Sequence, residues 1–200
     1  MRNDQRCDLR YASEDQATEA LVSYLEKHFD VTLQVRMEGL EVGPDAKVAD
    51  YRIDLIARHR HEPRWIVGFE VKKGFHFMRE YAAAIKQAAD YRAALIRDPE
   101  RAPDLDGKRL AAIMVFPEWT GMHDNGKLEY EREADGMSML AGNFRVGTCG
   151  LRKGRHGLTF RMGQGRLWSE GEGWIYNAEG ILFGKRRKGG VRANDDYIAR

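Results

Sequence analysis

The sequence predicts an α/β fold, with a mixed sheet flanked by helices in the first part of the chain and a glycine-rich, β-rich appendage after it. Hydrophobic periodicity over the first part changes in the order helix, three strands, helix, strand. The use of glycine and proline changes as well, because 16 of the 21 glycines follow Pro117 and all five prolines lie at or before it. We therefore expect a core over residues 1–120 and the appendage over residues 121–200.

The first helix is expected over residues 14–29. Ser13 followed by Gln16 is a capping-box pattern that marks its start. The apolar positions at helical spacing predict one buried side, made of Ala17, Leu21, Leu25 and His28. Alternation of apolar and polar residues then predicts a strand over residues 31–42, and Gly43-Pro44-Asp45 predicts a turn.

Two further strands are expected over residues 51–59 and 65–73, with a break at Glu62-Pro63. The second of them is apolar enough to lie in the centre of a sheet. In the first, regular alternation divides the side chains between two faces. One face would hold Tyr51, Ile53, Leu55 and Ala57, and the other Arg52, Asp54 and Ile56.

An alanine-rich segment predicts a second helix over residues 80–96, which stops before Asp98-Pro99 because proline cannot continue it. A buried strand is expected over residues 109–116. Since the helix separates this strand from the preceding one, we expect a crossover connection between them.

Composition excludes several classes of protein. No apolar run approaches the roughly 20 residues that cross a bilayer, and no basic-then-apolar leader opens the chain. The two cysteines, Cys7 and Cys149, are too few for a disulfide framework or a four-thiolate zinc site. No glycine-rich phosphate loop with a lysine is present, so the sequence does not indicate the use of ATP. We expect a cytoplasmic protein without a membrane partner.

Charge is unevenly distributed along the chain. The net charge is +2, but residues 145–192 contain 11 Lys/Arg and 3 Asp/Glu, a local net charge of +8 against −6 elsewhere. Such a basic segment favours an anionic partner, above all nucleic acid, and the alternative is a solvated basic tail. The expected phosphate contacts are Lys185, Arg186, Arg187 and Lys188. Tryptophans in the same segment suit either base stacking or a small aromatic core.

Two acidic residues and a lysine are predicted to converge. Glu70 and Lys72 lie two positions apart on the central strand, so both project from the same face. Pairing with the neighbouring antiparallel strand would bring Asp54 close to Glu70. Two such carboxylates suit a hard divalent cation such as Mg²⁺. Asp50 is a reserve ligand, because it lies an even number of positions from Asp54 and so projects from the same face. The alternative to a site is that Glu70 and Lys72 lie on an edge strand whose polar face is solvated.

These segments resemble a known superfamily. The strands RIDLIA and GFEVKK, followed by a helix with Gln87 and Tyr91, are similar to the core of the PD-(D/E)XK nucleases, which have a restriction-endonuclease-like fold. The Gln-x-x-x-Tyr signature resembles the RecB-like branch. The resemblance covers about residues 14–117, and Ile53 stands where the name of the family implies proline.

The resemblance implies roles for individual residues. Asp54 and Glu70 would be metal ligands, with the carbonyl of Val71 as a third, and Lys72 would be the catalytic lysine.

Gln87 and Tyr91 would face the site from the second helix. Members of the family often carry a glutamate on the first helix near the metal, for which Glu19 is our first choice and Glu14 the alternative.

We therefore expect a Mg²⁺- or Mn²⁺-dependent nuclease, a hydrolase that cleaves phosphodiester bonds, with DNA favoured by the resemblance. Lys73 projects away from Lys72 and is expected to contact phosphate or to be structural. Enzymes that cut two strands often dimerise, which leaves a homodimer as an option, but the sequence shows no interface. The alternatives are a catalytically silent nucleic-acid-binding module of the same fold, and an interaction or inhibitor protein that acts on a nucleic-acid-processing partner.

Overall fold

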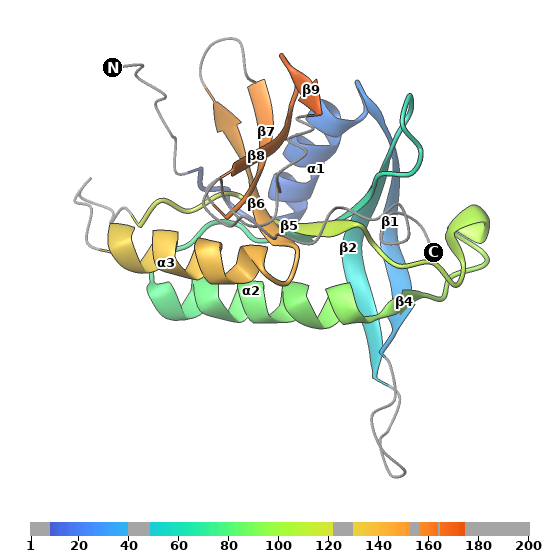
Figure 1. The fold of residues 1–200 in the computed structure, drawn as a ribbon, viewed down its shortest axis with the longest axis horizontal. Coiled ribbons are helices and arrows are strands. Elements are labelled where there is room, and N and C mark those ends of the chain that lie inside the picture. The colour runs from blue at the N-terminus through green and yellow to red at the C-terminus, as the bar shows by residue number, and fades with distance from the viewer. Residues whose placement is uncertain (1–8, 40–48, 122–129, 153–156, 164, 175–200) are drawn as a thin grey trace, which may run out of the picture.

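A mixed, curled sheet of nine strands and three α-helices make up the described part of the protein (Figure 1). The structure is a computed structural model that describes residues 9–39, 49–121, 130–152, 157–163 and 165–174. The sheet has the strand order β4-β1-β2-β3-β5-β6-β7-β8-β9. Strand β5 runs parallel to both β3 and β6, and every other neighbouring pair is antiparallel.

The elements have the following bounds. The helices are α1 (Glu14–Leu25), α2 (Met78–Ala93) and α3 (Glu131–Gly142), with a short 3-10 helix η1 (Pro103–Leu105). The strands are β1 (Phe29–Glu38), β2 (Asp50–His59), β3 (Ile66–Val71), β4 (Leu95–Ile96), β5 (Ala112–Phe116), β6 (Val146–Arg152), β7 (Gly157–Met162), β8 (Gly165–Ser169) and β9 (Gly173–Trp174). None of the described helices is both long and apolar enough to cross a membrane.

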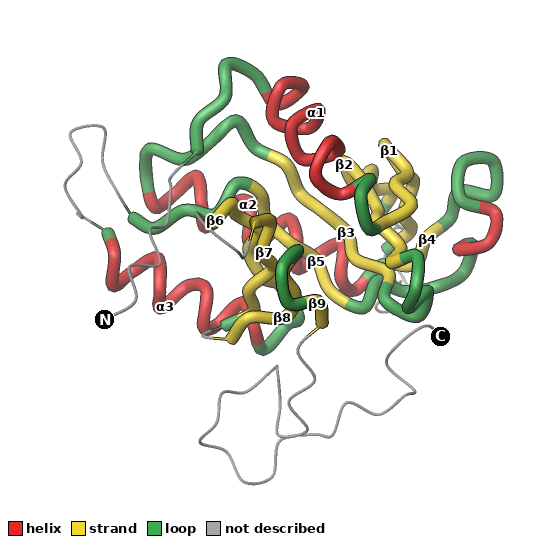
Figure 2. The backbone as a smooth tube through the Cα atoms, turned by 90° about the horizontal axis from the view of Figure 1, so that it is seen from above, coloured by secondary structure: helices red, strands yellow, loops and turns green. Residues whose placement is uncertain are grey.

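The sheet separates two hydrophobic cores. Helices α2 and α3 lie side by side against one face, and α1 lies on the other (Figures 1 and 2). Strands β7 to β9 curl toward the side of α1, so that their apolar residues join the core beneath that helix (Figure 1). Since both faces of β3 and β5 are covered, all the residues of these two strands are buried.

Helix α1 begins as predicted but ends four residues earlier. The side chain of Ser13 accepts a hydrogen bond from the backbone N–H of Gln16, which caps the helix. The helix ends at Leu25 because Phe29 is needed in β1, where it is fully buried against the rings of Phe160 and Trp168. Packing over a long sequence distance therefore overrides the helical periodicity.

Helix α2 also ends before the predicted position. It stops at Ala93, and Leu95 and Ile96 form the short edge strand β4 by pairing with β1. Ile96 is fully buried in this arrangement. The predicted crossover is confirmed, because α2 connects β3 to the parallel strand β5. Strand β5 starts at Ala112, three residues later than expected.

The segment after Pro117 continues the sheet of the first part. Strand β6 pairs with β5, and β7, β8 and β9 follow as antiparallel neighbours. Helix α3 was not predicted; it packs beside α2, where the hydroxyls of Tyr81 and Ser138 lie 2.8 Å apart. Trp168 is 1% exposed, so the aromatic-core interpretation holds for this tryptophan.

Candidate active site

The candidate site lies at the carboxyl end of β3. Glu70 is only 1% exposed, because β3 is flanked by β2 and β5 and covered on both faces. Lys72 follows the last residue of the strand, and its Nζ lies 2.6 Å from Oε1 of Glu70. The predicted convergence of these two side chains is therefore present in the structure, on a central strand rather than on an edge strand.

Contrary to the predicted alternation, the apolar side chains before and after Asp54 lie on opposite faces of the sheet. Ile53 belongs to the core beneath α2, whereas Leu55 belongs to the core beneath α1. In a regular strand, residues two apart project from the same face. The neighbouring strand β1 changes face over the same stretch, with Val31 on the α1 side and Val35 on the α2 side.

This irregularity gives Asp54 a backbone partner. The pairing of β2 with β3 ends at Leu55 and Phe69, so the N–H of Val71 has no partner in that ladder. Oδ2 of Asp54 accepts a hydrogen bond from the N–H of Val71 at 2.7 Å. The carboxylate of Asp54 is thereby held beside the strand that carries Glu70.

Gln87 and Tyr91 support the site from α2. Nε2 of Gln87 donates a hydrogen bond to Oη of Tyr91 at 2.6 Å, and that hydroxyl donates to the carbonyl oxygen of Arg52 at 3.0 Å. Tyr91 is 4% exposed. The pair thus fixes β2 two residues before Asp54, and burial, together with the carboxylates of Glu70 and Asp54, raises the pKa of Tyr91 to about 12.

Helix α1 contributes Glu14 rather than Glu19. Oε1 of Glu14 lies 3.7 Å from Nζ of Lys72. Glu19 is exposed. Five residues along a helix correspond to a rotation of about 140° from Glu14, so the two glutamates point in different directions. The structure therefore brings the alternative candidate to the lysine and leaves the first choice on the outer surface.

The electrostatics of the cluster follow from burial. Burial raises the pKa of Glu70 to about 7, although the contact with Lys72 opposes this rise. Burial also raises the pKa of Asp54, against the effect of the Val71 N–H. For Lys72, burial acts to lower the pKa, but the contact with Glu70 and the charge of Glu14 outweigh it and the pKa is raised. Ionising Asp54 and Glu70 at the same time is therefore unfavourable unless further positive charge is present.

No known protein family, curated protein or solved structure matches this chain.

Glu70 fits a cation ligand. Its two carboxylate oxygens are buried, and among the described residues the contact that Oε1 makes is the ion pair with Lys72 at 2.6 Å. The described residues contain no group of three or more His, Cys, Asp or Glu side chains that could together hold a metal ion. Mg²⁺ commonly takes only one or two protein carboxylates and completes its shell with water and substrate phosphate, which Asp54 and Glu70 could satisfy. A ligand role for the carbonyl of Val71 stays a prediction.

The other predicted residues do not join this cluster. Asp50 is 70% exposed and pairs with Arg36 at 3.5 Å. Lys73 is exposed, and its carbonyl oxygen accepts a hydrogen bond from the N–H of Tyr11. The basic run of Lys185, Arg186, Arg187 and Lys188 lies outside the described residues.

Sequence reasoning missed one residue near the site. Gln34 lies in β1 between the two residues that pair with Ile53 and Leu55, and its side chain acts to lower the pKa of Asp54, against the effect of burial. Its φ of 53° falls in the left-handed region, which residues with a side chain rarely adopt. Nothing in the alternating pattern of this segment indicates such a conformation.

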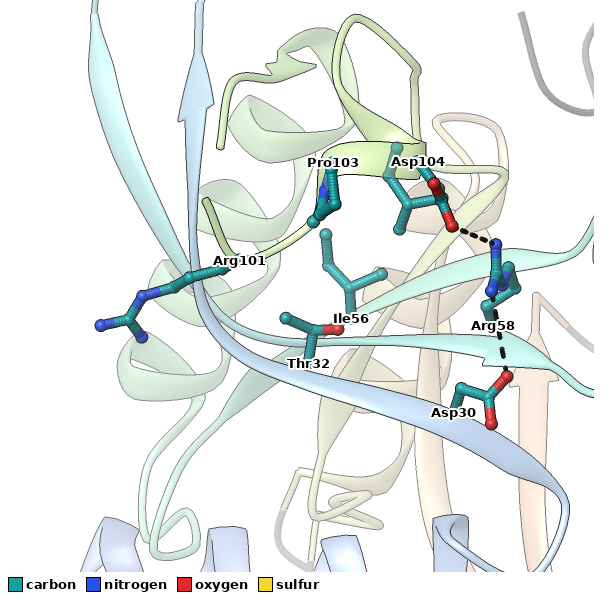
Figure 3. A pocket seen from close by; sticks show the side chains of 9 residues that line it. Asp30, Thr32, Ile56, Arg58, Arg101, Pro103 and Asp104 are labelled. Atoms are coloured by element: carbon teal, nitrogen blue, oxygen red, sulfur yellow. Dashed lines mark ion pairs between the residues drawn. The ribbon is translucent and has the colours of Figure 1, made fainter. Parts of the chain in front are cut away.

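A separate pocket lies between β1, β2 and η1 (Figure 3). It has a volume of about 110 Å³ and includes Arg58, which lies 4.0 Å from Asp30 and 3.9 Å from Asp104. None of the predicted site residues lines it. Because its two acidic and two arginine side chains offset one another, it shows no preference for an anion or a cation.

Proposed function

We propose that this protein is a divalent-metal-dependent nuclease that hydrolyses phosphodiester bonds, with DNA as the favoured substrate and Mg²⁺ or Mn²⁺ as the cofactor. The core would be restriction-endonuclease-like. The order of α1, β1, β2, β3, α2 and β5, with a crossover from β3 to a parallel β5, supports this fold assignment.

One observation carries the proposal: a buried glutamate with an ion-paired lysine lies beside a second carboxylate at the end of a central strand. Burying ionisable groups is costly unless they are paired or coordinate a metal. Lys72 supplies one positive charge for the two carboxylates of Asp54 and Glu70. A divalent cation would compensate the remaining charge, and such clusters of perturbed groups are typical of functional sites.

The residues of the chain have separate tasks in this proposal. Asp54 and Glu70 would hold the cation, which supplies Lewis-acid stabilisation of phosphate oxygens and lowers the pKa of water. The ammonium of Lys72 would donate hydrogen bonds to the attacking water or to the phosphate, and would stabilise the negative charge that develops there. Gln87 and Tyr91 would keep β2 and its aspartate in register.

The test is cleavage of end-labelled single-stranded, duplex and branched DNA with Mg²⁺, with Mn²⁺ and with EDTA. We expect cation-dependent cleavage by the wild type and its loss in both Glu70→Gln and Lys72→Met. Asp98→Asn is the matched control, because Asp98 is a buried carboxylate that accepts two backbone hydrogen bonds away from the site.

Three outcomes would contradict the proposal. The first is cleavage that survives Glu70→Gln and Lys72→Met, which would move the chemistry elsewhere. The second is binding of DNA by the wild type without cleavage under any cation, which would favour the silent binding module. The third is a loss of activity in Asp98→Asn as complete as in Glu70→Gln, since this would point to a general effect on folding.

A further inference from the structure

Gln34 adopts an unusual backbone conformation in β1, directly opposite Asp54. Its φ is 53°, within the strand β1. Among the described residues, one other residue with a side chain has a positive φ, Arg145 in the turn between α3 and β6. A left-handed residue is common where a helix ends. Within a strand, a left-handed residue marks an irregularity such as a β-bulge, and the irregularity at Gln34 lies opposite Asp54.

The neighbouring strand gives an explanation for this irregularity. Gln34 lies opposite Asp54, between the pairs Leu33–Leu55 and Val35–Ile53. At this point β1 and β2 both move their side chains from one core to the other. The N–H of Val71 in β3 donates a hydrogen bond to the carboxylate of Asp54 at 2.7 Å, and the side chain of Gln34 on the other neighbouring strand acts to lower the pKa of that carboxyl. Asp54 thus lies between a backbone donor of β3 and an amide side chain of β1.

We propose that Gln34 is a positioning residue that orients Asp54 for cation binding, an inference that rests on the proposed function. Without a cation, Asp54 is repelled by Glu70 and would rotate toward solvent. The amide of Gln34 and the N–H of Val71 together oppose that rotation. The left-handed backbone is then a local cost of bringing the amide to the carboxylate, and strained residues of this kind are typical of functional sites.

The test measures binding of Mn²⁺ alone by isothermal titration calorimetry, without nucleic acid. Gln34→Met keeps the length of the side chain but removes the donor. Gln34→Gly removes the donor and also relieves the backbone. Arg145→Gly is the matched control, because it relieves the same conformation away from the site. We expect Mn²⁺ affinity to fall by about 10–100-fold in both Gln34 variants, as is usual for residues that orient ligands, and to stay unchanged in Arg145→Gly.

Two further readouts separate positioning from folding. Thermal melting in EDTA should show Gln34→Gly no less stable than the wild type, because glycine tolerates a positive φ. Cleavage by the Gln34 variants should return toward the wild-type kcat as the Mn²⁺ concentration is raised. A positioning residue weakens the binding of the cation without removing the groups that act on the substrate.

The possible failures are distinguishable. If the wild type binds Mn²⁺ and both Gln34 variants bind it equally well, the positioning role is refuted while the proposed function stands. If Arg145→Gly loses as much affinity as Gln34→Gly, the effect comes from the backbone and the role is also refuted. If the wild type binds no Mn²⁺, both this inference and the proposed cation site fail.

Discussion

Glu70→Gln should stabilise the cation-free protein at alkaline pH. Glu70 is 1% exposed, and burial raises its pKa from 4.5 to about 7. The folded state therefore binds a proton at Glu70 more tightly than the unfolded state does. Below about pH 4.5 the carboxyl is protonated in both states and costs nothing, whereas above pH 7 the folded protein carries a buried charge that the unfolded chain exposes to water.

The magnitude follows from the two pKa values. A rise from 4.5 to about 7 corresponds to about 3 kcal/mol, at roughly 1.4 kcal/mol for each tenfold change. Glutamine is neutral at every pH and resembles the protonated carboxyl in shape. Lys72 keeps Glu14 as a partner at 3.7 Å and is 27% exposed, so it is not left buried without a partner. For a chain of this size, about 3 kcal/mol corresponds to a melting temperature raised by about 6–12 °C.

The assay is thermal melting in EDTA at pH 8 and at pH 4.5, followed by circular dichroism. Glu70→Gln should melt higher than the wild type at pH 8, and the difference should shrink toward zero at pH 4.5. With Mn²⁺ in excess, the wild type should gain stability that the variant does not. A variant that melts lower at pH 8, or a difference that is the same at both pH values, would refute the assignment of Glu70 as a group whose burial is unfavourable without a cation.

Two other variants test the surroundings of the site. Asp98→Asn should lower the stability of the protein, in contrast to Glu70→Gln. Although burial acts to raise the pKa of Asp98, hydrogen bonds from two backbone N–H groups outweigh it and lower this pKa. Its contribution is present above the unfolded pKa and is lost as pH falls through the lower folded value, so the variant should lose about 1–3 kcal/mol at pH 7 and little near pH 2, measured by urea unfolding. Tyr91→Phe removes the hydrogen bond to the carbonyl oxygen of Arg52 and should cost about 1–3 kcal/mol of stability and weaken Mn²⁺ binding; unchanged calorimetric affinity would contradict the supporting role of the hydroxyl.

The elements that carry the site were predictable because their signals are local. Glu70 lies within an apolar strand and Lys72 directly follows it, and charged residues in such a place need a partner or a ligand. The Gln87–Tyr91 pair follows from helical spacing, since residues four apart lie on the same side. The crossover from β3 to β5 follows from the helix between them.

The remaining features depend on contacts that no local pattern contains. The change of face at Asp54 arises jointly in β1 and β2, and regular alternation predicted the wrong faces for Ile53 and Leu55. The choice between Glu14 and Glu19 depends on how α1 is rotated above β3, which its own periodicity does not specify. Helix α3 was missed because its sequence is rich in small and polar residues, and its buried side is completed by α2, β6 and β7.

The curl of the sheet brings the two segments of the chain together in the core beneath α1. Trp174 of β9 stacks on Trp65, which immediately precedes β3, with ring centroids 4.4 Å apart and an angle of 14° between the planes. Lys27, just after α1, forms an ion pair with Glu170 at 3.0 Å. Residues of both segments must therefore meet before the core beneath α1 is complete, and contacts over such long sequence distances favour slow folding. Two stacked indoles that belong to different segments provide an intrinsic fluorescence signal for that closure.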